Sequence, residues 1–509
     1  MAKSLPELLL AAAAADPERP FLRFAGRTLS RAQVADAVVR TAGWLTRKGL
    51  AGHRVALLLE NRPEFLEAWL GAGLAGAVTV PLDPDLRADE LSTRLRVVRP
   101  SAVIVEQSAL PRILSLRAVL PSLRQVIVVG DAPDGTIPWS ALVEGPATPP
   151  VALDPDAATE IVYTAGATGR PRGVIWRHGR LAGAGDAFAR LLGLGGADQL
   201  MIVLPLFTAN AQFSVAMALG VGASILLERR FHAPSFWTTA RAGGATQVSL
   251  SGSLVSRLYS QRPRRSDGGH SIGRVLSVGT PKELHEAFEN RFGVSVIEAF
   301  GLTEAGYVTV NPVERGRRKL GTVGLPVPWC EVAVLDENMR PLAAGATGEI
   351  CIRPRRALPR LSSGYLEEEA DGKASSGRWV RSGDIGMSDD EGFFTFLGHR
   401  GDVVRRRGKA ISTSSIENAL LRHPAVSDAA VIGLPDGEML AVVVLRAPVA
   451  FEELARFCRD WLHGNAVPSC FKAVEHVPKT ASGRIRKSEL RNRAGIFDNL
   501  HRVSGRDER

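Results

Sequence analysis

The chain has 509 residues, 45% of them hydrophobic and 23% charged, with a formal net charge of +10 and a pI near 9.8. This length exceeds what one hydrophobic core supports and predicts two or more domains. The basic residues are mostly arginines spread along the whole chain, without a nucleic-acid-binding motif, so we expect small polyanions as partners and no nucleic acid.

The four cysteines lie far apart and without CxxC spacing, which argues against a zinc site and a disulfide framework. They are Cys330, Cys351, Cys458 and Cys470. Their scarcity favours a reducing, cytoplasmic location. The N-terminal stretch LLLAAAAA follows a proline and a glutamate, so we expect an amphipathic helix there and not a signal peptide. Since no apolar run reaches about 18 residues, no membrane span is expected.

In chain order, the first half alternates short apolar runs with segments of helix length. Continuous apolar runs are typical of strands buried on both faces, and this spacing predicts parallel strands joined by crossover helices. The predicted strands are 54–60, 77–83, 102–107, 125–131, 201–207, 223–229, 246–251 and 273–279.

From about residue 320 the predicted strands become shorter, which indicates a small β-rich subdomain. They are 330–337, 348–354, 378–386 and 392–399. We expect a hinge near Gly401 and Asp402, followed by a second compact pattern. It consists of helix 414–423, strands 428–434 and 440–447, and helix 451–462.

The expected fold class is therefore α/β. A large N-terminal domain, residues 1–400, contains several subdomains with parallel sheets and the small β-rich subdomain. A mobile α+β C-terminal domain, residues 401–509, follows it. The charged tail from Asn492 onward is expected to fray.

A glycine-rich stretch, YTAGATGRPRGV at 163–174, follows one predicted strand. Its glycines let the backbone curl around a phosphate. However, Ala165 and Ala167 lack hydroxyls, and the stretch is not a Walker A loop. Taken alone, it fits a surface turn equally well.

Two acidic motifs follow it. In EAFGLTEAG, 298–306, Glu304 stands beside Thr303, a pair suited to holding Mg²⁺ and phosphate oxygens. In RSGDIG, 381–386, Asp384 is predicted in a tight turn, where it could accept both hydroxyls of a ribose. A solvated helix start and ordinary turn chemistry explain the two motifs equally well in isolation.

The order of the motifs distinguishes these interpretations. YTAGATGRPRGV, GTP at 279–281, FGLTE, GTVGLP, GEICIR, SGDIG and VPKTASGRIRKSELR follow one another along the chain. This series resembles the adenylate-forming superfamily, which includes acyl-CoA synthetases, peptide-synthetase adenylation domains and luciferases. The resemblance covers nearly the whole chain, and residues 59–84 resemble the acyl-CoA synthetase branch.

The resemblance implies a two-step reaction. A carboxylate attacks the α-phosphate of Mg-ATP, giving an acyl adenylate and pyrophosphate. The C-terminal domain then rotates, and the thiol of coenzyme A displaces AMP. ATP, coenzyme A and Mg²⁺ are thus the implied cofactors, and the AMP moiety of the adenylate is what the site holds between the steps.

The resemblance also implies roles for particular residues. Phe300 would stack on adenine, Thr303 would contact the AMP phosphate, Glu304 would hold Mg²⁺ and Asp384 would hold the ribose. The implied catalytic residues are Glu304, Thr303, Arg484 and Thr208. The implied cofactor-binding residues are Thr164, Gly166, Thr168, Gly169, Arg172, Gly279, Thr280, Pro281, Phe300, Gly301, Asp384, Arg400 and Gly408.

Several positions depart from the family pattern. Arg484 replaces the lysine that bridges the substrate carboxylate and the α-phosphate, and Arg172 replaces the lysine of the phosphate loop. Thr208 replaces a histidine beside the carboxylate site, and His399 stands where an arginine is expected. Because the planar fork of arginine cannot place one compact donor between two oxygens, adenylation is expected to be weak or absent.

The sequence therefore predicts an acyl-CoA ligase specialised for the second half-reaction, supplied with adenylate by a separate adenylating enzyme. A complete ATP-dependent acid–CoA ligase is the alternative. An adenylating enzyme with a different acid or acceptor, such as an amine or a carrier-protein thiol, and a non-catalytic nucleotide-binding protein also remain open.

The substrate is bounded by the segments that would line its pocket, FTANAQF, SLSGSLV and AFGLTEAGY. They contain no aspartate to hold an α-amino group, and their small, apolar character predicts a bulky hydrophobic carboxylic acid. A homodimer is compatible with the sequence. The abundance of alanine and arginine is typical of a GC-rich bacterial genome, and a dedicated ligase suits a specialised biosynthetic pathway.

Overall fold

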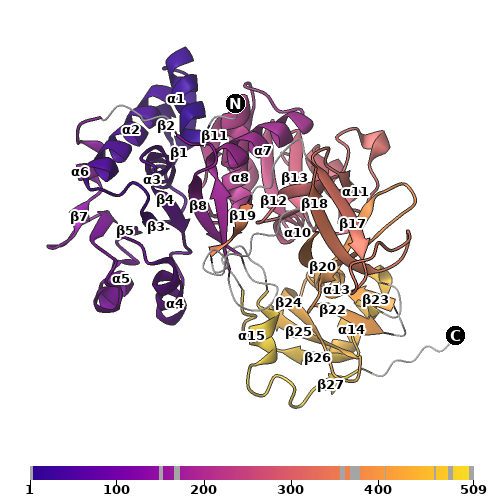
Figure 1. Cartoon of the computed structure of the whole chain (residues 1–509). Helices are drawn as coiled ribbons and strands as arrows, with labels where there is room; N and C mark the ends of the chain where they lie inside the picture. The colour runs from indigo at the N-terminus through magenta and orange to yellow at the C-terminus, as the bar shows by residue number, and fades with distance from the viewer. Residues whose placement is uncertain are drawn as a thin grey trace.

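The computed structural model describes residues 4–147, 153–164, 172–355, 362–366, 379–406, 409–462, 466–479 and 485–503. In Figure 1 the large N-terminal part occupies the upper half of the view, and the C-terminal part stands below it as a separate body. The boundary between them follows strand β21, Phe394–His399.

The first sheet has eight strands in the order β19-β9-β8-β4-β3-β5-β6-β7. Strands β3 to β7 and β8 run parallel, whereas β9 and β19 join antiparallel at one edge. The bounds are β3 (Arg54–Leu58), β4 (Val78–Pro81), β5 (Ala102–Glu106), β6 (Gln125–Val129), β7 (Ile137–Pro138), β8 (Ala158–Tyr163), β9 (Gly173–Arg177) and β19 (Ser362–Tyr365).

The second sheet has nine strands in the order β16-β15-β14-β13-β12-β10-β11-β1-β2. Its central strands, from β1 and β11 to β14, are parallel neighbours. The bounds are β1 (Pro20–Phe24), β2 (Arg27–Ser30), β10 (Gln199–Ile202), β11 (Ser224–Leu227), β12 (Gln247–Ser251), β13 (Arg274–Val278), β14 (Ser295–Leu302), β15 (Gly306–Val310) and β16 (Leu325–Pro326).

Helices buried between the two sheets form the main core. They are α1 (Leu5–Ala15), α2 (Arg31–Arg47), α3 (Pro63–Leu74), α7 (His178–Leu191) and α8 (Ala209–Val221). Helix α8 is apolar around its circumference, as expected of a helix covered on all sides. It packs on α7 at close range, because a Cβ on Gly185 would lie 2.6 Å from the Ala216 backbone carbon.

Further helices cover the outer faces of the sheets. Leu91 and Leu95 of α4 pack with Ile113 of α5 on the eight-stranded sheet. The bounds are α4 (Ala88–Val98), α5 (Leu110–Leu116), α6 (Ser140–Val143), α9 (Phe236–Gly243), α10 (Gly252–Tyr259) and α11 (Lys282–Phe292). The sheets are thus apolar on both faces, which explains the continuous apolar runs of their strands.

The β-rich subdomain is a four-stranded antiparallel sheet in the order β17-β18-β20-β21. Its strands are β17 (Cys330–Leu335), β18 (Gly348–Pro354), β20 (Val380–Ser388) and β21. Its last strand, β21, ends at His399, directly before the expected hinge at Gly401 and Asp402, and so connects this subdomain to the C-terminal part.

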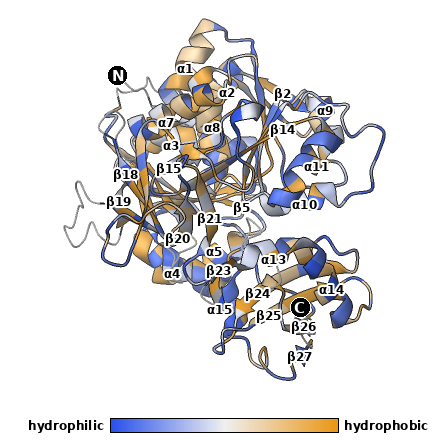
Figure 2. Ribbon diagram, turned by 90° about the vertical axis from the view of Figure 1, so that its right-hand side faces the viewer, coloured by the Kyte–Doolittle hydropathy of each residue, from blue (hydrophilic) through white to orange (hydrophobic). Residues whose placement is uncertain are grey.

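The C-terminal part has its own core, in which α13 and α14 pack on a mixed sheet of order β24-β25-β26-β27. Figure 2 shows its apolar strands beside helices with hydrophilic residues on their outer faces. The bounds are β22 (Val403–Arg406), β23 (Lys409–Ser412), α13 (Thr413–Leu420), β24 (Val426–Gly433), β25 (Met439–Leu445), α14 (Phe451–Trp461), β26 (Cys470–Ala473), α15 (Lys487–Arg491) and β27 (His501–Arg502).

The predicted strands and C-terminal helices are present, with two corrections. The tail beyond Asn492 does not fray throughout, since Ile496 is 2% exposed and β27 pairs with β26. The charged composition of the tail gave no indication that Ile496 would be buried. The strand expected at 201–207 is instead β10, Gln199–Ile202, because the chain turns at Pro205, whose carbonyl accepts from the Thr208 N–H.

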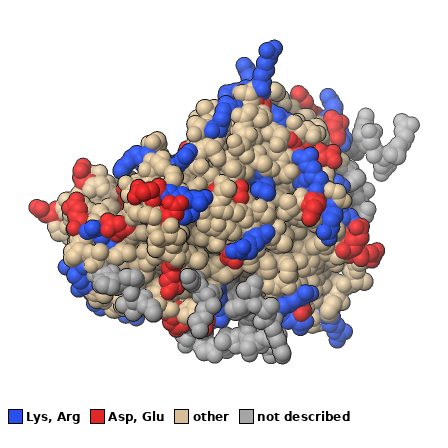
Figure 3. Space-filling view, turned by 90° about the horizontal axis from the view of Figure 1, so that it is seen from above, with Lys and Arg blue, Asp and Glu red and all other residues tan. Residues whose placement is uncertain are grey.

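Charged side chains of both signs are mixed on the surface of the molecule. On the face in Figure 3, lysine and arginine side chains are interspersed with acidic ones. The pairs Arg40–Asp36 and Arg190–Asp186 illustrate this mixing. All four cysteines are free and buried. Among the described residues, no helix combines the length and apolarity that a membrane crossing requires.

Candidate active site

The base of the glycine-rich loop is formed where β8 ends and β9 begins. The backbone N–H of Thr164 donates to the Arg172 carbonyl at 2.9 Å, which joins the two ends of the loop. The loop residues between these ends, including Gly166, Thr168 and Gly169, lie outside the described residues, as do Arg484 and Gly408.

The hairpin between β14 and β15 carries Thr303 and Glu304. The indole N–H of Trp176, buried in β9, donates to the Thr303 carbonyl at 2.8 Å. This hydrogen bond ties the hairpin to the strand that leaves the glycine-rich loop. The hairpin needs glycine at Gly301, since a Cβ there would lie 2.5 Å from the Gly306 carbonyl oxygen.

Tyr365, which sequence reasoning missed, joins the two predicted motifs. Its hydroxyl donates to Glu304 Oε1 at 2.6 Å, and the Arg172 guanidinium lies 3.3 Å from the centre of its ring. Edge strand β19 brings Tyr365 here by pairing with β9. The chain has only four tyrosines, and the sequence clue to this contact was the tyrosine in SSGYL, at 362–366.

Glu298 of β14 fixes the predicted adenine-side loop. Its carboxylate accepts the backbone N–H groups of Gly279 and Thr280, the latter at 3.2 Å. Burial raises the pKa of Glu298 to about 7, against the lowering effect of these N–H donors. Gly279 has φ +84°, a left-handed conformation that glycine adopts without strain, and Pro281 then leads into α11.

Phe300 lies two residues after Glu298 on the same face of β14. It is buried, and its ring centre lies 5.8 Å from that of Phe396 in β21. Phe396 in turn packs edge-on to His399 at 5.6 Å. The structure thus brings the predicted adenine ring partner next to the β-rich subdomain.

Asp384 lies within strand β20, in agreement with the strand expected at 378–386, and is paired with His399 of β21. The tight turn expected at the same place is a bulge in this strand, where the Asp384 N–H donates to the Ser382 hydroxyl at 2.9 Å and Gly383 has φ +75°. The side chain is 2% exposed, and its Oδ1 forms an ion pair or hydrogen bond with His399 Nδ1. Ser382 and Gly383 form this bulge, because the pairing with β18 passes from Arg381 to Ile385. The residue that departs from the family pattern, His399, therefore contacts the predicted ribose ligand.

Arg400, adjacent to His399, is held elsewhere. Its backbone N–H donates to the Gly383 carbonyl at 2.8 Å, and its guanidinium donates to Glu349 Oε2 at 2.5 Å. Glu349 also accepts from Arg381 at 2.7 Å. In this arrangement Arg400 stabilises the β18–β20 pairing.

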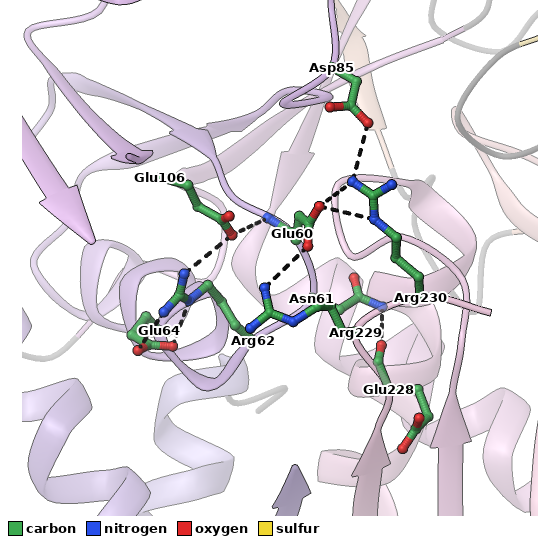
Figure 4. A network of polar contacts seen from close by, with 9 residues as sticks. All are labelled: Glu60, Asn61, Arg62, Glu64, Asp85, Glu106, Glu228, Arg229 and Arg230. Atoms are coloured by element: carbon green, nitrogen blue, oxygen red, sulfur yellow. Dashed lines mark hydrogen bonds and ion pairs between the residues drawn. The ribbon is translucent and has the colours of Figure 1, made fainter. Parts of the chain in front are cut away.

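Thr208 is the residue before α8, and its hydroxyl donates to the Pro205 carbonyl at 2.6 Å. Asn61 fixes the preceding turn: its amide donates to the Leu204 carbonyl at 3.0 Å and accepts the Leu206 N–H at 2.7 Å. A further hydrogen bond of 2.9 Å reaches the Glu228 carbonyl (Figure 4). Asn61 thereby joins the carboxyl ends of strands from both sheets. Sequence reasoning did not single it out.

The pocket segments differ from the small character that the sequence suggested. They contribute Phe213 and Tyr307, both buried, with ring centres 5.2 Å apart. Phe188 of α7 stacks on Tyr307 at 4.5 Å. These segments therefore contribute large aromatic side chains, which pack on one another in the core.

The donors present fit a magnesium ion held jointly by protein and nucleotide. In the described part of the chain, no three or more His, Cys, Asp or Glu side chains gather as a metal site. Mg²⁺ commonly takes one or two protein carboxylates and completes its shell with substrate phosphates and water. Glu304, oriented by Tyr365, is suited to that role.

The chain has two large sheets, a glycine-rich segment between β8 and β9, an acidic hairpin beside it and a separate C-terminal part. This combination is typical of an adenylate-forming enzyme. Residues 9–366 match the AMP-binding enzyme family, and residues 415–484 match the AMP-binding enzyme C-terminal domain. The chain belongs to this family, in the CoA ligase branch of the adenylate-forming superfamily, as the sequence predicted.

Individual relatives agree with this assignment. The crotonobetaine/carnitine–CoA ligase of Salmonella paratyphi A is 30% identical over 487 residues, which cover 91% of this chain and 93% of the relative. The anthranilate CoA ligase AuaEII, in complex with anthranoyl-AMP, has a TM-score of 0.87 and 23% identity, covering 96% of this chain and 97% of its own. The o-succinylbenzoate CoA synthetase MenE of Bacillus subtilis, with the intermediate OSB-AMP, has a TM-score of 0.81 and 25% identity, over 96% and 98%. The predicted α/β fold class is confirmed.

Proposed function

We propose that this chain forms acyl-CoA thioesters from acyl adenylates and coenzyme A, and that its own adenylation activity is weak or absent. The observation that carries the proposal is the placement of Arg172. The central carbon of its guanidinium lies 3.3 Å from the centre of the Tyr365 ring, and this cation–π contact would compete with a contact between Arg172 and a triphosphate. The adenylate-holding groups, in contrast, are already fixed by Trp176, Tyr365 and Glu298.

In the proposed reaction the sulfur of coenzyme A attacks the carbonyl carbon of the acyl adenylate. A carbon–sulfur bond forms, the bond from that carbon to the phosphate oxygen breaks, AMP leaves with the electron pair, and the thiol proton passes to solvent. Thr303 would donate to the phosphate of the leaving AMP, which stabilises the charge that develops there. Bound Mg²⁺, held by Glu304, would neutralise phosphate charge.

Binding and orientation are the other contributions of the chain. Phe300 and the loop of Gly279, Thr280 and Pro281 would receive the adenine, and Asp384 with His399 would receive the ribose. The apolar and aromatic character of the segments FTANAQF, SLSGSLV and AFGLTEAGY supports a hydrophobic carboxylic acid as the acyl group. Rotation of the C-terminal part about Gly401 and Asp402 would open the route for the thiol.

A complete ATP-dependent acid–CoA ligase is the second candidate. Two observations favour it: Arg484 keeps the positive charge of the lysine that it replaces, and the 30% identical relative is named a CoA ligase. The two candidates differ in one measurable property, the ability to start from the free acid.

A paired mass-spectrometric assay on the purified chain tests the proposal. One reaction contains synthetic acyl adenylates with coenzyme A, and the other contains the free acids with Mg-ATP and coenzyme A. We expect thioester from the adenylates and at least about 100-fold less from the acids, the range that one misplaced electrostatic group costs. Comparable thioester in both reactions would contradict the specialisation and leave the complete ligase.

The variant Arg484→Lys then tests the cause. If arginine limits adenylation, Arg484→Lys should raise thioester formation from the free acid and leave the reaction from the adenylate nearly unchanged. Arg456→Lys, on the exposed face of α14, is the matched control and should change neither reaction. Absence of thioester from every adenylate would contradict both candidates.

A further inference from the structure

The peptide bond between Gly401 and Asp402 is attached to the N-terminal part of the molecule. The Asp402 N–H donates to the His399 carbonyl at 2.7 Å. His399 is the last residue of β21, and the Arg400 N–H donates to the Gly383 carbonyl of β20 at 2.8 Å. The peptide plane between Gly401 and Asp402 therefore belongs with the four-stranded sheet of the β-rich subdomain.

The next peptide bond, between Asp402 and Val403, is attached to the C-terminal part. The Asp402 carbonyl accepts from the hydroxyl of Thr413, at the start of α13, at 2.8 Å. Val403 pairs with Ser412 in the hairpin of β22 and β23. Because peptide planes are rigid, the two backbone torsions of Asp402 are the rotatable bonds that separate these two attachments.

Helix α15 is fixed to the C-terminal part by a buried lysine at its first residue. Lys487 Nζ lies 2.7 Å from Glu417 Oε1 and donates to the Thr413 hydroxyl oxygen at 2.6 Å. The Lys487 and Glu417 side chains are 7% and 9% exposed, and Glu417 also accepts the Val431 N–H of β24 at 2.8 Å. A buried polar network with its hydrogen bonds made is rigid, so α15 moves together with α13 and β24.

Arg491, the last residue of α15, reaches back across Asp402. Its guanidinium donates to the Gly401 carbonyl at 2.6 Å and lies 3.4 Å from Asp402 Oδ1. The Gly401 carbonyl is part of the peptide plane that belongs with the N-terminal part, whereas α15 belongs with the C-terminal part. The hydrogen bond between Arg491 and Gly401 therefore crosses the pivot, and rotation about Asp402 breaks it.

The surroundings of Arg491 leave room for this separation. An open pocket of about 340 Å³ lies beside the contact, and Gly401 and Arg491 line it together with Val403, Val404, Leu434 and Pro435. In the described part of the chain, a Cβ added at Gly401 would also lie in open space. The guanidinium can thus leave the carbonyl without displacing a packed side chain.

We propose that Arg491 is a positioning residue for the proposed acyl transfer, which holds the C-terminal part in the described orientation. The pivot is Asp402 and not Gly401. This inference rests on the function proposed above, in which coenzyme A reacts after the C-terminal part has rotated. Loss of the contact between Arg491 and Gly401 then favours the rotated orientation.

Single-molecule fluorescence energy transfer between two dyes measures the orientation without any turnover. The dyes are attached at Ser115→Cys in α5 and Asp460→Cys in α14, two exposed positions, and the four natural cysteines are buried. A hydrogen bond from a charged donor changes such an equilibrium by about 10- to 100-fold, and with 33% of the Arg491 side chain exposed we expect the lower value. Arg491→Met should therefore raise the ratio of the rotated to the described orientation about tenfold.

The kinetics of acyl transfer give a second readout, which a loss of folding would not reproduce. Since coenzyme A reacts only after rotation, its apparent affinity is reduced by the fraction of the chain that is rotated. With a preformed acyl adenylate, Arg491→Met should lower the KM for coenzyme A about tenfold and leave kcat nearly unchanged. Arg491→Lys keeps a donor for the Gly401 carbonyl and should have a KM closer to that of the unchanged chain.

Three further variants separate the contact across the pivot from general effects. Arg493→Met is the matched control, because Arg493 donates to the His476 carbonyl at 3.2 Å within the C-terminal part. Thr413→Val removes a hydrogen bond on the C-terminal side of the pivot, and Gly401→Ala restricts the torsions of the residue on its N-terminal side. None of the three should change the ratio of the orientations. A larger shift in Thr413→Val or Gly401→Ala than in Arg491→Met would place the pivot elsewhere and overturn the inference.

The two readouts also distinguish this inference from the proposed function. If Arg491→Met shifts the fluorescence ratio and no adenylate is converted to thioester, the assignment of Arg491 and the pivot stands and the proposed function fails. If thioester forms, and Arg491→Met changes neither the fluorescence ratio nor the KM for coenzyme A, the proposed function stands and the inference is overturned.

Discussion

At the scale of the residue, Tyr365 contacts two charged side chains of the proposed site. Its hydroxyl donates to Glu304 and its ring lies under Arg172. A hydrogen bond to a carboxylate that binds a metal fixes the orientation of that carboxylate, and its loss commonly lowers metal affinity by about 10- to 100-fold. With Glu304 proposed to hold Mg²⁺, we propose Tyr365 as a positioning residue that acts through Glu304.

Tyr365→Phe tests this role, since it removes the hydroxyl and keeps the ring. We expect the Mg²⁺ concentration that half-saturates ATP binding to rise about tenfold, as measured by isothermal titration calorimetry at several Mg²⁺ concentrations. Tyr365→Leu removes the ring as well and releases Arg172 from its cation–π contact, so at saturating Mg²⁺ it should bind ATP at least as tightly as Tyr365→Phe does. An unchanged Mg²⁺ dependence in Tyr365→Phe would contradict the assignment.

At the scale of the element, strand β8 carries a fully buried acid, Glu160. Its Oε1 accepts from the Gln212 side-chain amide of α8 at 2.7 Å. Burial raises the pKa of Glu160 well above the ordinary value, more than Gln212 and Trp69 lower it. The carboxyl is thus neutral in the fold at pH values where it ionises in the unfolded chain, so the unfolded state gains stability as pH rises above the unfolded pKa.

Glu160→Gln keeps the shape and removes the titration. The melting temperature of the unchanged chain should fall relative to that of Glu160→Gln as pH rises from about 5 to 8, because the folded chain binds a proton that the unfolded chain has lost. Differential scanning calorimetry across this range measures the difference. Glu144→Gln, on an exposed residue, should track the unchanged chain, and a difference independent of pH would refute the explanation.

The strands themselves could be predicted from the sequence, but their pairing partners could not. The apolar runs at 54–60 and 102–107 predicted β3 and β5 because strands covered on both faces need such runs. At Asp384 the sequence offered both a strand and a turn, and pairing with distant residues decided between them: Asp384 pairs with His399 of β21, while the pairing with β18 passes over it at a bulge. Ile496 was missed for a similar reason, since the sheet that buries it is formed by distant residues.

At the scale of the whole molecule, the C-terminal part contacts the N-terminal part through an ion pair. Arg486, just before α15, lies 2.7 Å from Glu90 on the first turn of α4, with 28% and 24% of the two side chains exposed. At the other end of α15, Arg491 donates to the Gly401 carbonyl, at the position of the proposed hinge, at 2.6 Å. One end of α15 therefore contacts the N-terminal part and the other contacts the segment proposed as the hinge.

Removing this pair should shift the balance between domain orientations. A partly exposed ion pair contributes at most about 1 kcal/mol, so Glu90→Gln should change the single-turnover rate of acyl transfer by up to about fivefold. The charge exchange Glu90→Arg with Arg486→Glu should restore the original rate. If the exchange changes the rate of acyl transfer by the combined effect of the two single variants, the ion pair does not control the domain orientation.

By itself the sequence determined the layered α/β architecture, the order of the motifs and the family, because these follow from local apolar patterns and from residues adjacent in the chain. Only the tertiary structure decided which partners each site residue has. Tyr365 reaches Glu304 through an edge strand, Asn61 joins two sheets, and Glu298 accepts the backbone N–H groups of Gly279 and Thr280. Such contacts join segments far apart in sequence, and their geometry is set by sheet pairing and side-chain packing, which no local pattern encodes.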